Sequence, residues 1–136
     1  MTAAPNRSYL FIPGNRPDRF DKACAAGADA VIVDLEDAVP PEDKKAARAA
    51  LEEWLTPQQP VLVRINGADT EWFRDDLNLC GLPGVAGIVL PKAERAEHMF
   101  AVKAAGARLI LPLIESALGL WNVAEIARAT RGQRLR

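Results

Sequence analysis

Short apolar runs alternate with helical segments along the whole chain, and this alternation limits the possible folds more than any other feature. Five of the runs are typical of buried strands, at residues 9–12, 30–33, 61–63, 88–90 and 109–114. Repeated strand–helix units joined by short turns form parallel sheets with right-handed crossovers. The sequence therefore predicts an α/β protein.

The segments between these runs carry the start and stop residues of helices. We expect helices to begin at Pro17, at Pro41, at Asp69 or Thr70, near Glu94, and after Ser116. Proline needs no amide donor in a first turn, and Asp, Thr and Ser can cap one. The second segment repeats apolar residues on one side, at Ala47, Leu51, Trp54 and Leu55, which predicts packing against a sheet.

Two architectures accommodate five strand–helix units. A doubly wound sheet would complete its core in 136 residues, but its polar residues would gather at one switch point. A (β/α)8 TIM barrel has polar residues at the ends of all its strands, and eight units of about 27 residues would need roughly 220. All five runs here end in polar or turn residues, and residues 131–136 look like a turn that leads into another strand. We therefore predict a single domain, residues 1–136, that forms about the first five βα units of a barrel.

Composition and charge exclude several classes of partner. The chain has 17 Lys and Arg residues against 18 Asp and Glu residues, a net charge of −1, and the two signs are interleaved. That balance lacks the basic surface of a nucleic-acid-binding protein. No apolar run approaches the roughly 20 residues needed to cross a bilayer, and the first residues lack the apolar core of a signal peptide. We expect a cytoplasmic protein with no membrane or nucleic-acid partner.

Charged residues follow the predicted strands where chemistry would be expected. The second run ends in Asp34-Leu35-Glu36-Asp37, the third in Arg64, the fourth in Lys92 and the fifth in Glu115. Because the carboxyl ends of parallel strands share one face, these side chains should converge on one pocket. The chain is therefore predicted to be an enzyme.

Each charged residue has both a structural and a functional interpretation. Three carboxylates in four residues need a cation or an arginine among them, and Arg64 is the expected partner. Arg64 could tie neighbouring strands together, or its planar fork could bind a substrate carboxylate. Glu115 follows an apolar strand, so a metal or a cationic partner is expected there. Lys92 could form a Schiff base in a metal-free aldolase, but acids nearby favour a charged, orienting lysine.

Read together, five segments resemble the citrate lyase β-subunit family of Mg²⁺-dependent carbon–carbon lyases, which includes malyl-CoA lyases. The segments that carry the resemblance are residues 7–17, 34–39, 63–67, 90–92 and 114–116, in the order found in that family. The resemblance implies a (β/α)8 barrel and a Mg²⁺ ion held by Glu115 and by an aspartate on the following strand. That aspartate would lie beyond Arg136.

The same resemblance implies a reaction and assigns roles to residues. A 3-hydroxyacyl-CoA such as citryl-CoA or malyl-CoA would be cleaved, or formed, from an acyl-CoA and a 2-oxoacid. Glu115 and Arg64 would bind the oxoacid, and Glu36 and Asp37 would orient Arg64 and water. The coenzyme A contacts implied are Phe11, Arg16 and Lys22. The family usually forms oligomers, so a homo-oligomer is expected. The alternative is a truncated or degenerate barrel that binds acyl-CoA or oxoacid without turnover.

Overall fold

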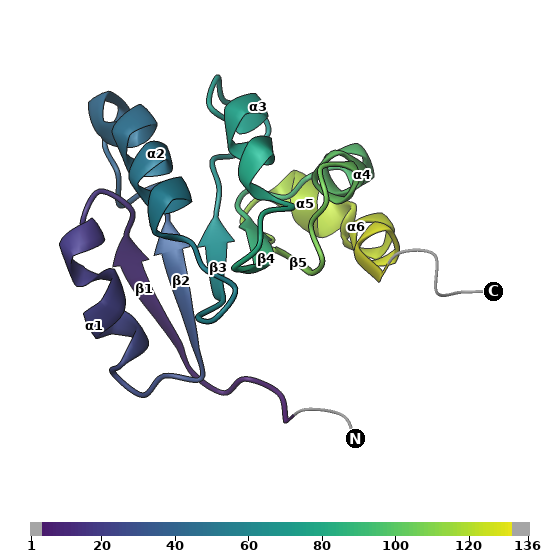
Figure 1. Cartoon of the computed structure of the whole chain (residues 1–136). Helices are drawn as coiled ribbons and strands as arrows, with labels where there is room; N and C mark the ends of the chain where they lie inside the picture. The colour runs from purple at the N-terminus through teal and green to yellow at the C-terminus, as the bar shows by residue number, and fades with distance from the viewer. Residues whose placement is uncertain (1–3, 132–136) are drawn as a thin grey trace.

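A computed structural model describes residues 4–131, and its centre is a five-stranded parallel sheet (Figure 1). The strands are β1 (Tyr9–Pro13), β2 (Ala30–Asp34), β3 (Val61–Arg64), β4 (Val85–Leu90) and β5 (Ile110–Pro112). Each strand pairs with the next one along the chain, so their spatial order is the same as their sequence order. All five predicted strands are confirmed, with β4 beginning three residues earlier than expected and β5 reduced to three residues.

Helices connect successive strands and lie along the sheet (Figure 1). They are α1 (Phe20–Cys24), α2 (Lys44–Trp54), α3 (Phe73–Asp76), α4 (Ala96–Ala104), α5 (Ala117–Trp121) and α6 (Val123–Arg131). Three 3₁₀ turns accompany them: η1 (Pro17–Arg19), η2 (Pro41–Asp43) and η3 (Leu77–Leu79). Pro17 and Pro41 stand at the starts of η1 and η2, as predicted, because a first turn does not need their missing amide hydrogen.

The two faces of the sheet have different neighbours. The main core fills the space between the sheet and the helices, and its largest fully buried side chains include Phe20, Leu51, Leu79, Met99 and Ile126. A smaller apolar cluster of Ile32, Leu62 and Val89 covers the opposite face. Side chains alternate between faces along a strand, so Asp34 and Arg64, two residues after Ile32 and Leu62, continue that opposite face. The strand period thus brings both charges to the face away from the helices.

Two of the predicted helices differ from the prediction. The third begins at Phe73 rather than near Thr70, because the Thr70 hydroxyl donates to the carbonyl of Gly67 at 2.7 Å and closes a turn instead. The fifth starts after Ser116 as expected, with the Ser116 hydroxyl accepting from the amide of Gly119. It then breaks at Asn122, whose side chain donates to the carbonyl of Glu94, so one predicted helix becomes α5 and α6. The stripe on α2 is confirmed: Ala47 and Leu51 are buried.

The strand order argues against the doubly wound sheet. A doubly wound sheet reverses direction at a switch point, whereas this sheet proceeds from β1 to β5 without reversal, as the first strands of a barrel would. The barrel itself is not seen: within residues 4–131 the sheet is open, with β1 and β5 as its edges. In the same part of the chain, no helix has the length and apolar character needed to span a membrane.

Gly14 lets the chain leave β1 close to the end of β2. Its amide donates to the carbonyl of Asp34 at 2.8 Å, and a Cβ at this position would lie 2.9 Å from that oxygen and 2.7 Å from Leu35. Gly14→Ala should therefore lower the free energy of unfolding by about 1–3 kcal/mol, because the backbone oxygen cannot move aside cheaply. Urea denaturation followed by circular dichroism measures this. Ala49→Ser, on an exposed position of α2, should stay within about 0.5 kcal/mol, and equal effects of the two would contradict the close-packing argument.

Candidate functional site at the carboxyl ends of the strands

An arginine–aspartate pair joins the ends of β2 and β3. The Nε and Nη2 atoms of Arg64 donate to the two carboxylate oxygens of Asp34 at 2.8 and 2.6 Å. Asp34 is 1% exposed, and its carboxylate also accepts from the backbone amides of Glu36 and Ala38. Burial alone would raise the pKa of Asp34, but the Arg64 and amide hydrogen bonds outweigh burial and lower it. Asp34 is therefore a buried anion that fixes the plane of the guanidinium.

The other side of Arg64 lies toward Glu36. Nε and Nη2 are used by Asp34, whereas Nη1 lies 3.6 Å from Glu36 Oε1, beyond hydrogen-bond distance. The Phe11 ring from β1 stacks on the guanidinium, with the Arg64 Cζ atom 4.9 Å from the ring centroid. Its hydrogen bond to Asp34 raises the pKa of Arg64 further, so the group stays charged. The Nη1 side is thus the part of Arg64 that could receive a carboxylate.

Lys92 connects two acids that come from different strands. Its ammonium lies 2.6 Å from Glu36 Oε2, and its backbone amide donates to Glu115 Oε2 at 2.8 Å. The hydrogen bond to Glu36 raises the pKa of Lys92, so the amine is protonated. A Schiff base needs a neutral amine, and the ion pair therefore favours the charged, orienting lysine expected from the sequence.

Glu36 is the acid between the two cations. Its side chain is 8% exposed, and its Oε1 atom is buried without a hydrogen-bond partner in the described part of the chain. A buried carboxylate oxygen without a donor is costly unless a ligand or water completes its shell. This oxygen therefore lacks a donor that a bound ligand or a water molecule could supply.

Asp37 lies at the surface beside the strand ends. It is exposed, and its side chain makes no hydrogen bond or ion pair with any residue between 4 and 131. Asp34 makes the hydrogen bonds that orient the guanidinium of Arg64, and the orientation of metal-bound water by Asp37 stays a prediction. Asp37 does line a cavity of about 310 Å³ together with Glu36 and Lys92.

Lys44 holds the turn that carries Glu36. Its ammonium is buried and donates to the carbonyls of Leu35 and Glu36 at 2.9 and 2.8 Å. It also lies 5.0 Å from the centre of the Trp72 ring. Burial lowers the pKa of Lys44, and nearby acids, Asp34 foremost, oppose this effect. Sequence reasoning missed Lys44 because a lysine near a helix start is ordinary, and its carbonyl acceptors are a product of the tertiary fold.

A second buried aspartate supports the loop after β3. Asp76 accepts from the backbone and side-chain amides of Asn66 at 2.8 and 2.7 Å and from Arg48 Nε at 2.8 Å. It is fully buried, so this network fixes the chain two residues beyond Arg64. The sequence alone did not indicate this role for Asp76, because the pair Asp75-Asp76 is typical of the exposed face of a helix.

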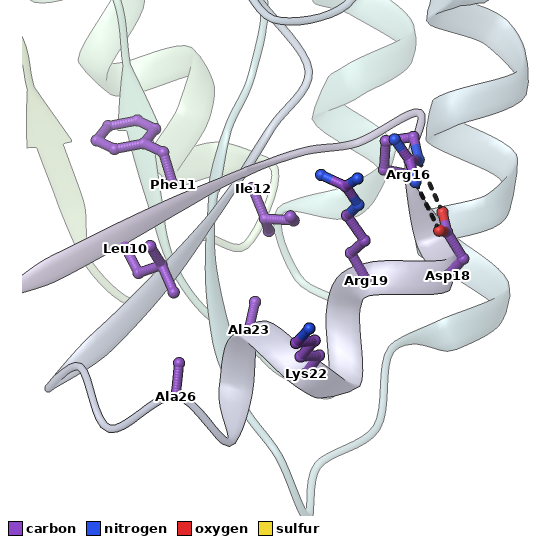
Figure 2. Close-up of a pocket in the computed structure, with 9 residues that line it drawn as sticks. All are labelled: Leu10, Phe11, Ile12, Arg16, Asp18, Arg19, Lys22, Ala23 and Ala26. Carbon is purple, nitrogen blue, oxygen red and sulfur yellow. Dashed lines mark hydrogen bonds and ion pairs between the residues drawn. The ribbon is translucent and has the colours of Figure 1, made fainter.

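The three residues implied as coenzyme A contacts line one pocket beside β1 (Figure 2). This pocket of about 650 Å³ is lined by Leu10, Phe11, Ile12, Arg16, Asp18, Arg19, Lys22, Ala23 and Ala26. Figure 2 shows Phe11 on the opposite side of the strand from Leu10 and Ile12. Three cations and one acid line the pocket, and that acid, Asp18, pairs with Arg16 at 2.8 Å. The charge favours an anionic ligand.

Oxygen atoms are the potential metal ligands at the strand ends. Glu36, Asp37 and Glu115 supply carboxylates, which suit hard cations such as Mg²⁺. Within residues 4–131, no group of three His, Cys, Asp or Glu residues is close enough to hold a metal. Glu36 is already paired with Lys92, whereas Glu115 is exposed and has Oε1 available. Carboxylate oxygens are the donors that a hard cation takes, and Glu115 has one such oxygen without a hydrogen bond in the described part of the chain.

A protein-family model described as HpcH/HpaI aldolase/citrate lyase matches residues 7–134. This match covers nearly the whole chain. The chain belongs to the HpcH/HpaI aldolase/citrate lyase family. The expected resemblance to citrate lyase β subunits and malyl-CoA lyases is thereby confirmed.

The relatives include proteins named as thioesterases and proteins named as lyases. A (3S)-malyl-CoA thioesterase of Cereibacter sphaeroides is 42% identical over 134 residues, which is 95% of this chain and 47% of the relative. An L-malyl-CoA/beta-methylmalyl-CoA lyase of the same species is 39% identical and covers 94% of this chain and 46% of the relative. The chain spans about half the length of the curated relatives it matches.

Solved structures show the same fold. The citrate lyase β subunit of Mycobacterium tuberculosis, complexed with oxaloacetate and magnesium, is 40% identical with a TM-score of 0.79, over 93% of this chain and 55% of that one. CitE from the same organism, in complex with magnesium, acetoacetate and coenzyme A, is 41% identical with a TM-score of 0.79, over 93% of this chain and 46% of that one.

Asp34→Asn tests how much the buried pair contributes to the fold. Removing the charge leaves the guanidinium uncompensated, so the free energy of unfolding at pH 7 should fall by about 3 kcal/mol. The folded-state pKa of Asp34 lies below its ordinary value of 3.8, so its contribution is present above that value and disappears as the pH falls through the folded-state pKa. The variant should therefore lose less stability than the wild type as the pH falls below about 4.

Asp18→Asn is the matched control, because Asp18 makes the same two-bond contact with Arg16 on an exposed surface. Solvent screens that pair, so its removal should leave the free energy of unfolding nearly unchanged. Denaturant titrations at several pH values compare the two variants. If both variants had the same small effect, Asp34 would not be the structural anchor of Arg64.

Proposed function

We propose that this chain carries the oxoacid-binding and metal-binding half of a Mg²⁺-dependent carbon–carbon lyase acting on a 3-hydroxyacyl-CoA. The observation that carries the proposal is the continuous set of contacts from Asp34 through Arg64, Glu36 and Lys92 to Glu115 at the strand ends. Family membership and the magnesium, oxoacid and coenzyme A in the complexes of the relatives support it. The homo-oligomer and the complete eight-unit barrel belong to the same proposal.

Arg64 would bind the carboxylate of the 2-oxoacid through its Nη1 side. Asp34 and the Phe11 ring hold the guanidinium in one plane before the ligand arrives, so little side-chain freedom is lost on binding. Glu36 stands at the same edge, and its negative charge is balanced by Lys92. This balance keeps Glu36 from competing for Arg64 as strongly as an unpaired carboxylate would.

Glu115 would hold the Mg²⁺ through Oε1, while Oε2 keeps the amide of Lys92. A second carboxylate ligand, an aspartate on the next strand, is expected beyond Arg136. When bound, the ion supplies a Lewis acid that stabilises charge developing on the oxoacid oxygen. The cationic pocket beside β1 would take the coenzyme A part of the substrate, with Arg16 and Lys22 facing its phosphates and Phe11 at the border with Arg64.

A thioesterase is the second candidate function, because relatives with that name are as similar to the chain as the lyases. The two reactions differ in their products. A lyase acting on malyl-CoA forms acetyl-CoA and glyoxylate, whereas a thioesterase forms malate and a free coenzyme A thiol. Binding without turnover, as in a degenerate barrel, would give neither set of products.

Glu115→Gln tests the metal ligand. The substitution keeps the size of the side chain and removes its charge, so Mg²⁺ binding should weaken at least tenfold, the equivalent of about 1.4 kcal/mol. Isothermal titration calorimetry of the 136-residue chain with MgCl₂ measures this. Glu97→Gln, at an exposed acid on α4, should bind Mg²⁺ as the wild type does. Equal affinities of all three proteins would exclude Glu115 as a ligand.

Product analysis with Arg64→Lys tests the reaction and the oxoacid site together. A protein that contains this chain together with the rest of the barrel should release glyoxylate without free thiol when it is incubated with malyl-CoA and Mg²⁺. Lysine keeps the charge but not the planar fork, so the affinity for glyoxylate should fall by about 1.5–3 kcal/mol. Thiol release with malate would support the thioesterase instead, and unchanged glyoxylate affinity in a folded Arg64→Lys would make Arg64 a purely structural tie.

A further inference from the structure

Lys92 has an unusual backbone conformation for a residue with a side chain. Its φ angle is 49°, and it is the one residue other than glycine with positive φ in the described part of the chain. A left-handed conformation costs roughly 1–2 kcal/mol for an ordinary residue, so it persists only when its surroundings impose it. Glycine or asparagine would adopt it at lower cost, yet the chain has lysine here.

The surroundings that impose this conformation lie on both sides of Lys92. The amide of Leu113 donates to the carbonyl of Leu90 at 2.9 Å, and the amide of Ala93 donates to the carbonyl of Leu113 at 3.0 Å. Pro91 and Lys92 therefore form a short loop. The residues on either side of it, Leu90 and Ala93, are both hydrogen-bonded to Leu113. This arrangement fixes the direction of the Lys92 amide hydrogen.

The start of α5 packs against the end of the same loop, at Ala93. A Cβ on Gly119 would lie 2.4 Å from the carbonyl oxygen of Ala93, so the helix backbone sits directly against that residue. Ser116, which caps α5, also donates to the carboxylate of Glu94 at 2.8 Å. Glu115 is the residue before this cap, so the segment with the acid and the segment with Lys92 are tied together at several points.

We infer that Lys92 is a positioning residue that holds Glu115 through its backbone and Glu36 through its side chain. The left-handed backbone directs the amide at Glu115 Oε2, and the ammonium reaches Glu36 Oε2. Within residues 4–131, the Lys92 amide is the hydrogen-bond donor that the structure gives to Glu115. One residue thus sets the distance between the acid proposed to hold Mg²⁺ and the acid beside Arg64, and this inference rests on the proposed function.

Three substitutions at Lys92 can separate the role of its backbone from the role of its charge. Lys92→Asn, Lys92→Ala and Lys92→Val all lack the ammonium, but they tolerate the left-handed backbone in decreasing order. If the backbone positions Glu115, the Mg²⁺ dissociation constant should rise at least threefold from the asparagine to the alanine variant, and further in the valine variant. Circular dichroism shows whether each variant is folded, and the asparagine–alanine comparison suffices if the valine variant is not.

A measurement without metal tests the same contact. In ¹⁵N-labelled chain, hydrogen exchange at the Lys92 amide should be at least tenfold faster in Glu115→Ala than in the wild type, because the acceptor is lost. Exchange at the Leu113 amide, which donates to Leu90, should be unchanged and serves as the internal control.

The outcomes distinguish the inference from the proposed function. If the Lys92 amide of the wild-type chain is protected from hydrogen exchange, the positioning role is supported. If the same chain binds no Mg²⁺, the proposed metal site is contradicted. Mg²⁺ affinity that stays equal across the folded Lys92 variants would overturn the positioning role and leave the metal site in place. Equal amide exchange in the wild type and Glu115→Ala would also overturn the positioning role.

Discussion

The contact between Arg64 and Asp34 determines the arrangement of the whole candidate site. It joins the last residues of two adjacent strands, and their register places the two residues directly opposite each other. A buried carboxylate is unfavourable without partners, and Asp34 satisfies its oxygens with one guanidinium and two backbone amides. Because Asp34 provides these contacts from within the fold, Arg64 has a fixed plane and a fixed side left for a ligand.

The parts of the site that follow from strand period could be predicted from the sequence. Polar residues after apolar runs indicated that Arg64, Lys92 and Glu115 would meet at one edge, and the contacts through Lys92 show that Lys92 joins Glu36 to Glu115. The order of the strands followed from the same alternation of strand and helix. These features depend on local sequence and on the geometry of parallel sheets, which one sequence is enough to show.

Other features depend on distances that a sequence does not contain. Asp34, Glu36 and Asp37 are equally plausible partners of Arg64 in the sequence, and only the backbone amides that fix Asp34 decide among them. The break between α5 and α6 depends on Asn122 reaching a carbonyl from another unit. Spacing alone also cannot say which acid of a turn is buried: Asp34 and Glu36 are buried, whereas Asp37 is exposed.

Phe11 relates the strand-end site to the cationic pocket beside β1. Its ring contacts the guanidinium of Arg64, and Phe11 also lines the pocket beside α1. Its ring is half-exposed although it stacks on the guanidinium, which leaves apolar surface for a ligand that extends from one region to the other. A molecule with a polyanionic end and a small carboxylate end, as in an acyl-CoA joined to an oxoacid, has the shape and charge for such a path. The two regions therefore support one substrate class better than either does alone.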